Sequence, residues 1–111
     1  MPPDYVPKPF HCDVAHLDGT VRLSPRGDLD MGSVPILEER LRSALNGGGK
    51  QLVIDLRGLE FMDSTGLTML TRWSRGAEQD GYELALVRGE DRIHRLFEIT
   101  GMVAFFTFVD G

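Results

Sequence analysis

The stretch LVIDLRGLEFMDSTG, residues 52–66, predicts how the rest of the chain folds. It opens with a short apolar run rich in β-branched side chains, which is typical of a strand buried on both faces. Residues 57–62 are expected to lead the chain off that strand as a loop. Asp63, Ser64 and Thr65 follow, and their side-chain oxygens can accept hydrogen bonds from the unpaired N–H groups that open a helix. We therefore expect Ser64 at a helix N-terminus, at the carboxyl end of a central strand.

The residues upstream of this stretch predict an antiparallel hairpin. Residues 10–16 and 20–23 alternate apolar and polar side chains, and Asp18-Gly19 between them is a strong signal for a two-residue turn. Pro25 has no N–H to donate, so it is expected to end the strand pairing or to mark a sheet edge. The Gly27–Asp30 segment is then expected to turn the chain into the first helix.

Apolar residues at helical spacing predict three helices, the first with Ser33 as its N-cap and Pro35 in its first turn. The expected helices cover residues 33–46, 64–79 and 90–100. Residues 82–87 read as a strand between the last two helices. The phenylalanine-rich residues 103–109 are expected to add a final strand or a short apolar segment.

A hairpin followed by alternating strands and helices predicts a single α/β domain. Its sheet should be mixed, with the N-terminal antiparallel hairpin at one side and helices following the later strands. Parallel strands joined by crossovers place the starts of their helices along one edge, so residues 28–30 and 63–64 should meet there. The proline-containing residues 1–9 read as a flexible leader, and residues 10–111 as the folded domain.

Composition excludes several classes of function. The net charge of −5 argues against a nucleic-acid surface, which needs concentrated Lys and Arg. No apolar run approaches the roughly 20 residues that span a bilayer, so no membrane association is expected. The single Cys12 cannot form an internal disulfide, and together with the lack of a signal peptide this favours a cytoplasmic location.

Catalysis is hard to assemble from these residues, and we expect neither an enzyme nor a metal or cofactor. His11 and His16 lie in the expected hairpin and His94 on a helix surface, without metal-ligand spacing. Ser64 lacks the Gly-x-Ser-x-Gly surroundings of a hydrolase nucleophile and an evident histidine base. One alternative remains, a metal-assisted enzyme with a divalent ion held by three carboxylates, those of Asp28, Asp30 and Asp63.

Ser64 is better suited to modification. A phosphoryl group there would be favoured by the helix N-terminus by about 0.3–1 kcal/mol. It would also add roughly −1.5 to −2 charges beside Asp63. Like charges forced together at an interface cost several kcal/mol, so a docked partner would respond strongly. The other interpretation of the same residues is that Ser64 or Asp63 simply caps the helix.

Three segments resemble the motifs of STAS-domain anti-sigma factor antagonists. Residues 27–30, GDLD, resemble the G-[E/D]-L-D element, and residues 59–67, LEFMDSTGL, resemble the F-x-D-S-[S/T]-G-L signature. Residues 95–102, RLFEITGM, are similar to the R-L-F-x-x-[T/S]-G-[L/M] end of a helix. The resemblance extends from about residue 10 to residue 109.

The resemblance implies a bacterial partner-switching role in transcription and the stress response. In this family, an unphosphorylated antagonist binds an anti-sigma factor that is also a serine kinase, which releases a sigma factor. The kinase then phosphorylates the serine that follows the aspartate, and a phosphoserine phosphatase reverses the modification. By position, the phosphorylation site is Ser64. The implied partner-binding residues are Asp28, Asp30, Asp63, Thr65 and Gly66. ATP belongs to the kinase, so no cofactor is implied.

A second function from another class is a constitutive STAS-type module that binds a protein or a small ligand without phosphorylation. An unbroken apolar cavity lined by Phe61, Met62 and Trp73 would favour that module.

Overall fold

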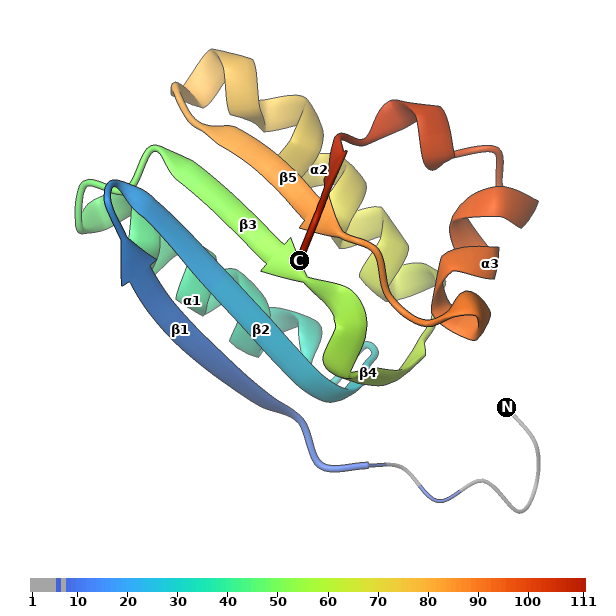
Figure 1. Cartoon of the computed structure of the whole chain (residues 1–111). Coiled ribbons are helices and arrows are strands. Elements are labelled where there is room, and N and C mark those ends of the chain that lie inside the picture. The colour runs from blue at the N-terminus through green and yellow to red at the C-terminus, as the bar shows by residue number, and fades with distance from the viewer. Residues whose placement is uncertain (1–5, 7) are drawn as a thin grey trace.

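One mixed sheet forms the centre of the computed structural model, which describes residue 6 and residues 8–111 (Figure 1). The strands lie in the order β1 (His11–Leu17), β2 (Thr20–Leu29), β3 (Gln51–Asp55), β5 (Glu83–Val87) and β6 (Phe108–Val109), and β4 (Leu59–Met62) pairs with the end of β2. β1 is antiparallel to β2, and the other pairs in the described part of the chain are parallel. The single α/β domain with an N-terminal antiparallel hairpin is confirmed. Most of the proposed leader, residues 1–9, lies outside the described residues and stays a prediction.

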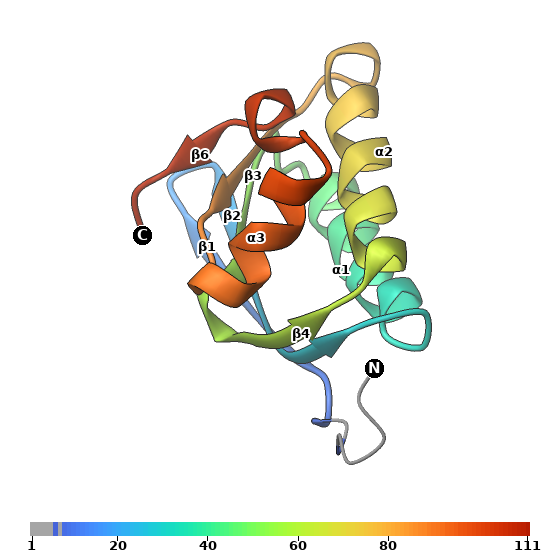
Figure 2. The same cartoon turned by 90° about the vertical axis from the view of Figure 1, so that its right-hand side faces the viewer.

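The helices are α1 (Val34–Asn46), α2 (Ser64–Asp80) and α3 (Asp91–Ile99), with short 3₁₀ turns η1 (Leu56–Gly58) and η2 (Val103–Phe105). Figure 2 shows α1 and α2 running along one face of the sheet. Several strand residues that point to this face are fully buried, among them Leu23, Ile54 and Leu86. Their neighbours on the opposite face are more accessible, since Gln51 and Glu83 are exposed. The core therefore lies between the sheet and its helices.

The hairpin turn follows its sequence signal. Asp18 has φ of 49° and Gly19 has φ of 85°, and Leu17 pairs with Thr20 across the two residues. A two-residue turn with positive φ at both positions matches the right-handed twist of the strands that it joins. This part of the prediction is confirmed.

Of the two expectations for Pro25, an end of the strand pairing is wrong, because β2 continues through it to Leu29. The other expectation, a sheet edge, agrees with the side of β2 that faces away from β1. Pro25 lies opposite Cys12, at a position of the β1–β2 ladder where the two residues exchange no hydrogen bonds. Its missing N–H would therefore point away from β1. On that side the pairing of β2 with β3 stops at Leu23, and the pairing with β4 starts only at Gly27. The proline sits in the gap between them, where no ladder bond is lost.

Two linked expectations are also wrong, since residues 59–62 are not a loop and residues 27–29 are not a turn. They form β4 and the end of β2, with Gly27 opposite Leu59 and Leu29 opposite Met62. Each segment looks like a loop because it is short, and each becomes a strand only by pairing with the other.

The C-terminal residues close the sheet with a short segment, as expected. Residues 103–109 form η2 and the two-residue strand β6, which pairs with β5. His94, expected on a helix surface, is only 5% exposed. Its ring lies 5.7 Å from that of Phe97 and 5.1 Å from that of Phe108, so β6 covers the helix face that this histidine occupies.

Candidate functional site

Ser64 is the first residue of α2 and is exposed to solvent. β4 ends at Met62, and the N–H of Asp63 donates to the carbonyl of Leu29 at the end of β2 (3.3 Å). The serine is therefore held at the start of a long helix, two residues after the end of a paired strand. Its hydroxyl makes no hydrogen bond to any of the residues that the structure describes.

Asp63 is the N-cap of α2. One carboxylate oxygen, Oδ1, accepts hydrogen bonds from the N–H groups of Thr65 (2.9 Å) and Gly66 (3.2 Å). The carboxylate thus satisfies two of the N–H groups that have no partner within the helix, and its charge lies at the positive end of the helix dipole.

Asp63→Ala is expected to lower the free energy of unfolding by about 1 kcal/mol, because both hydrogen bonds of this cap are lost. Asp63→Asn keeps an acceptor oxygen and should lose less. Urea unfolding followed by circular dichroism measures both values. An alanine variant as stable as the original chain would show that the cap contributes nothing.

Gly66 allows α2 to pack closely against the ends of β2 and β4. A Cβ atom at this position would lie 2.8 Å from Cγ of Met62 and 3.1 Å from Cγ of Leu29. The residue is itself buried. The glycine that follows Ser64-Thr65 therefore serves the packing beneath the serine.

Asp28 is buried, with an exposed fraction of 3%. Its carboxylate accepts the backbone N–H of Lys8 at 3.2 Å. The preceding Gly27 has φ of 91°, and a Cβ there would overlap the carbonyl oxygen of Pro9. Gly27 leaves room for the backbone of Pro9, and Asp28 binds the backbone of Lys8. Residues 8 and 9 can therefore pack beside the end of β2.

Asp30 organises the turn between β2 and α1. Its Oδ1 accepts the N–H groups of Gly32 (3.0 Å) and Ser33 (3.2 Å). Ser33 occupies the N-cap position but makes no side-chain capping bond; its hydroxyl donates to the carbonyl of Asp28 at 2.6 Å. This closed set of hydrogen bonds fixes the path from the strand to the helix.

The structure brings the two predicted segments together, since the pairing of β2 with β4 sets residues 28–29 beside residues 61–62. Ser64 is the most accessible of the proposed site residues: Asp30, Asp63 and Thr65 are partly buried, and Asp28 and Gly66 are buried. Asp63 caps the helix and Gly66 packs against the strands, whereas Ser64 is exposed.

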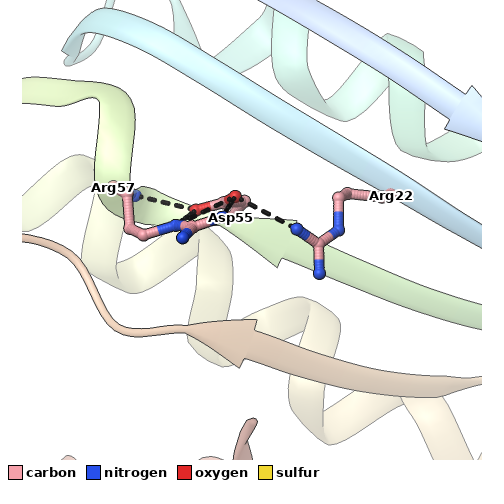
Figure 3. Close-up of polar contacts among 3 residues, drawn as sticks. All are labelled: Arg22, Asp55 and Arg57. Atoms are coloured by element: carbon pink, nitrogen blue, oxygen red, sulfur yellow. Dashed lines mark hydrogen bonds and ion pairs between the residues drawn. The ribbon is translucent and has the colours of Figure 1, made fainter. Parts of the chain in front are cut away.

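The sequence did not lead us to an ionic cluster at the β3 end of the connection between β3 and β4 (Figure 3). The side chain of Asp55, 10% exposed, accepts Nη2 of Arg57 at 2.8 Å and Nη1 of Arg22 at 3.3 Å. The backbone N–H of Arg57 also donates to this carboxylate, at 3.0 Å. The Asp-x-Arg spacing at the end of a strand is the signal that could have identified the Arg57 contact. The cluster ties β2 to β3 and fixes η1, from which β4 leads to Ser64.

The hydrogen bonds from Arg57 hold the pKa of Asp55 below its usual value, against the opposing effect of burial. A lowered carboxyl pKa stabilises the fold above the pKa of the unfolded chain, about 3.9, and this contribution disappears as pH falls through the folded value. Asp55→Asn should therefore be less stable than the original chain at pH 7. Urea unfolding at several pH values should show the difference shrinking below about pH 4. A constant difference would rule out this ionic origin.

Phe61, Met62 and Trp73 do not line one cavity. Phe61 and Met62 border a hollow of about 230 Å³ between β4 and α3, whereas Trp73 borders another between α1 and α2. The indole N–H of Trp73 donates to Glu38 at 2.9 Å, so this residue joins the two helices. The cavity that would have favoured a small-ligand module is not formed by these three residues.

Within the described residues, no cluster of three or more His, Cys, Asp or Glu side chains has the arrangement of a metal site. Asp28, Asp30 and Asp63 have hydrogen bonds to backbone N–H groups instead. In the same part of the chain, no helix is both long and apolar enough to cross a membrane.

The structure is a single α/β domain with an exposed serine at the start of α2, and comparison with known proteins gives its family. The model of the STAS domain family, described as "Mlab, STAS domain", matches residues 12–107. The anti-sigma-B factor antagonist of Staphylococcus aureus (strain NCTC 8325 / PS 47) is 40% identical over 76 residues, which are 68% of this chain and 70% of that protein. The chain belongs to the STAS domain family and is similar to its anti-sigma factor antagonists.

Solved structures agree with this family. The crystal structure of an anti-sigma factor antagonist from Mycobacterium paratuberculosis has a TM-score of 0.82 and 25% identity, covering 96% of this chain and 90% of that chain. The unphosphorylated form of the antagonist SpoIIAA has a TM-score of 0.73 and 19% identity, covering 89% and 88% of the two chains, and shares the fold. SpoIIAA from Bacillus also has a structure in its phosphorylated form.

Proposed function

We propose that this chain is an anti-sigma factor antagonist controlled by phosphorylation of Ser64. In its unphosphorylated form it binds an anti-sigma factor with serine kinase activity, which releases a sigma factor. Phosphorylation of Ser64 by that kinase ends the binding, and a phosphoserine phosphatase restores it. The cycle takes place in the cytoplasm, and the chain itself holds no cofactor and catalyses no reaction.

The observation that supports this proposal is the contrast between Ser64 and its neighbours. Asp63 and Gly66 are engaged in capping and packing, whereas Ser64 is exposed and its hydroxyl has no partner among the described residues. A kinase can reach such a hydroxyl without opening the core. A phosphoryl group added there breaks no hydrogen bond described in the structure, so the domain should stay folded while its surface charge changes.

Electrostatics supports a switch of binding more than a switch of folding. The helix N-terminus favours the new negative charge, and the nearby Asp63 carboxylate disfavours it, so the two local effects oppose each other. At an interface, the roughly −1.5 to −2 added charges meet whatever acidic groups the partner presents. The names of the relatives agree with this role: one is called an anti-sigma-B factor antagonist, and SpoIIAA is known in both phosphorylation states.

The partner-binding residues proposed beside Ser64 divide into two kinds. Asp28 and Gly66 are buried, so they act by holding the ends of β2, β4 and α2 in place. Asp30, Asp63 and Thr65 are partly accessible and lie at the same edge, where they can contact the partner as well as shape the surface.

Affinity capture from native cytosol tests the proposal. The original chain and Ser64→Glu serve as baits, and captured proteins are identified by mass spectrometry. We expect an anti-sigma factor with a kinase domain on the original chain and its loss on the acidic variant. Equal capture by both baits would indicate a constitutive binding module in which Ser64 is only part of a helix start.

The captured kinase then allows a direct test of the modified residue. Incubation with ATP should phosphorylate the original chain and leave Ser64→Ala unmodified. Thr68→Ala is the matched control, because Thr68 is exposed one helical turn further along α2. Thr68→Ala should be phosphorylated like the original chain. Phosphate found on Thr68, or equal phosphorylation of Ser64→Ala and Thr68→Ala, would show that the modified residue is not Ser64.

A further inference from the structure

The outer side of β5 is only half covered. β3 pairs with β5 along its whole length, from Glu83 to Val87. On the opposite side, β6 pairs only with Leu86 and Val87. No described strand lies beside Glu83–Ala85 on that side, so the amino half of β5 is a sheet edge.

The backbone groups of Leu84 point to this edge. On the inner side, towards β3, the N–H of Glu83 donates to the carbonyl oxygen of Lys50 at 2.8 Å. On the outer side, the N–H of Leu86 donates to the carbonyl oxygen of Thr107 at 2.9 Å. Successive residues of a strand present their backbone groups to alternate sides. Leu84, two residues before Leu86, therefore presents its N–H and C=O outwards, before β6 begins. An edge of this kind is a template for another strand.

A groove of about 650 Å³ runs beside this edge. Its walls include Ser74, Ala77 and Glu78 of α2, residues 83–85 of β5, and Thr107 and Val109 around β6. From there the groove continues over residues 51–53 of β3 to Thr20 of β2. Leu84 and Ala85 are only partly buried. The groove thus offers space and accessible apolar surface at the place where the backbone hydrogen-bonding groups lack a strand partner.

The rim of the groove is acidic. Glu78 and Glu83 are both exposed, and neither forms an ion pair within the described part of the chain. Glu83 accepts a hydrogen bond from the uncharged amide of Gln51 at 3.2 Å. Lys50 begins the same end of the sheet but does not line the groove. Charge complementarity therefore favours a cationic occupant.

We propose that the outer edge of β5 binds an extended segment of a protein partner that carries lysine or arginine. The segment adds to the sheet as a strand in line with β6, with its backbone paired to Leu84 and its cationic side chains near Glu78 and Glu83. Main-chain hydrogen bonds supply the affinity, and the acidic rim supplies the preference for basic sequences. This surface is separate from Ser64, so binding here does not depend on the state of that serine.

The test uses the isotope-labelled full chain and a blocked seven-residue peptide of alternating lysine and valine. In the free protein, the amide of Leu84 should exchange with deuterium at least about tenfold faster than that of Leu86, which is hydrogen-bonded. Addition of the peptide should slow the exchange of Leu84 by a similar factor, equally in the original chain and in Ser64→Glu. A Leu84 amide that is already protected, or that the peptide does not protect, would overturn the proposal.

Two comparisons separate strand addition from general attraction of a basic peptide to an acidic protein. Glu78→Lys with Glu83→Lys should weaken binding by about tenfold or more, whereas the matched Glu39→Lys with Glu98→Lys, on α1 and α3, should not. Two further peptides carry N-methyl groups on the odd or on the even residues. Only one should bind, because the added strand pairs through the N–H groups on one of its sides, and methylation of those groups blocks the pairing. Equal effects of the two charge pairs or of the two methylation patterns would contradict strand addition. Protection of Leu84 that rises with protein concentration alone would instead assign the edge to a second copy of the chain.

Discussion

Ser64→Glu is expected to weaken binding to the kinase-type anti-sigma factor by about 100-fold or more, and Ser64→Ala to keep the original affinity within about threefold. A factor of 100 corresponds to about 2.7 kcal/mol, within the several kcal/mol that like charges cost when an interface forces them together. Alanine removes only a hydroxyl that is exposed and has no partner among the described residues. Titration calorimetry with the purified partner measures both affinities.

Two controls make this result specific. Thr68→Glu adds the same charge on the exposed face of α2, one turn beyond Ser64, and should have a much smaller effect if the contact is centred on the serine. Thermal unfolding of Ser64→Glu should match that of the original chain, because a helix N-terminus tolerates an acidic side chain. Equal affinities of the alanine and glutamate variants would rule out a charge switch at this position.

The local part of the site could be predicted from the sequence because its signals are local. Asp63 caps α2 through N–H groups two and three residues ahead, and the Asp18-Gly19 turn joins strands that adjoin it directly. Such interactions involve neighbouring residues, so residue type and spacing are enough to predict them. The position of Ser64 at the start of a helix followed from the same kind of signal.

The rest depended on contacts between distant residues. The strand β4 has four residues and exists because the end of β2 pairs with it, so neither segment shows a complete strand pattern alone. The contact of Arg22 with Asp55 joins residues 33 positions apart. The need for glycine at position 27 becomes evident only when Pro9 is seen against it. Contacts between residues that are distant in the sequence determine these features, and a single sequence does not show which distant residues meet.

Under the proposed function, the frame around Ser64 would let a partner detect a small change of surface charge. β4 is tied to β2 by pairing, η1 is held by Asp55, and α2 is seated through Gly66. Side chains locked by packing and hydrogen bonds keep a functional group in one geometry. The proposed modification of Ser64 would therefore change the charge at a fixed position, and the fold would not need to rearrange.

Leu56→Ala is expected to lower the free energy of unfolding by about 2–5 kcal/mol. Leu56 is 0% exposed and is the first residue of η1, where β3 passes into the connection that leads to β4. Shortening this side chain removes buried apolar surface and leaves a cavity that the surrounding strands can fill only in part. Urea unfolding measures the loss, and the melting temperature should fall by roughly 8 °C or more.

The matched control is Leu17→Ala, because Leu17 is 60% exposed at the end of β1 and the same atoms are removed. That variant should lie within about 0.5 kcal/mol of the original chain. If Leu56→Ala lowers the free energy of unfolding by less than about 1 kcal/mol, the residues around position 56 must close in on the smaller side chain and fill the cavity. Folded Leu56→Ala, assayed well below its melting temperature, should still bind the anti-sigma factor, because the change leaves Ser64 and its cap intact. Loss of binding by the folded variant would instead show that the connection between β3 and β4 positions the serine surface directly.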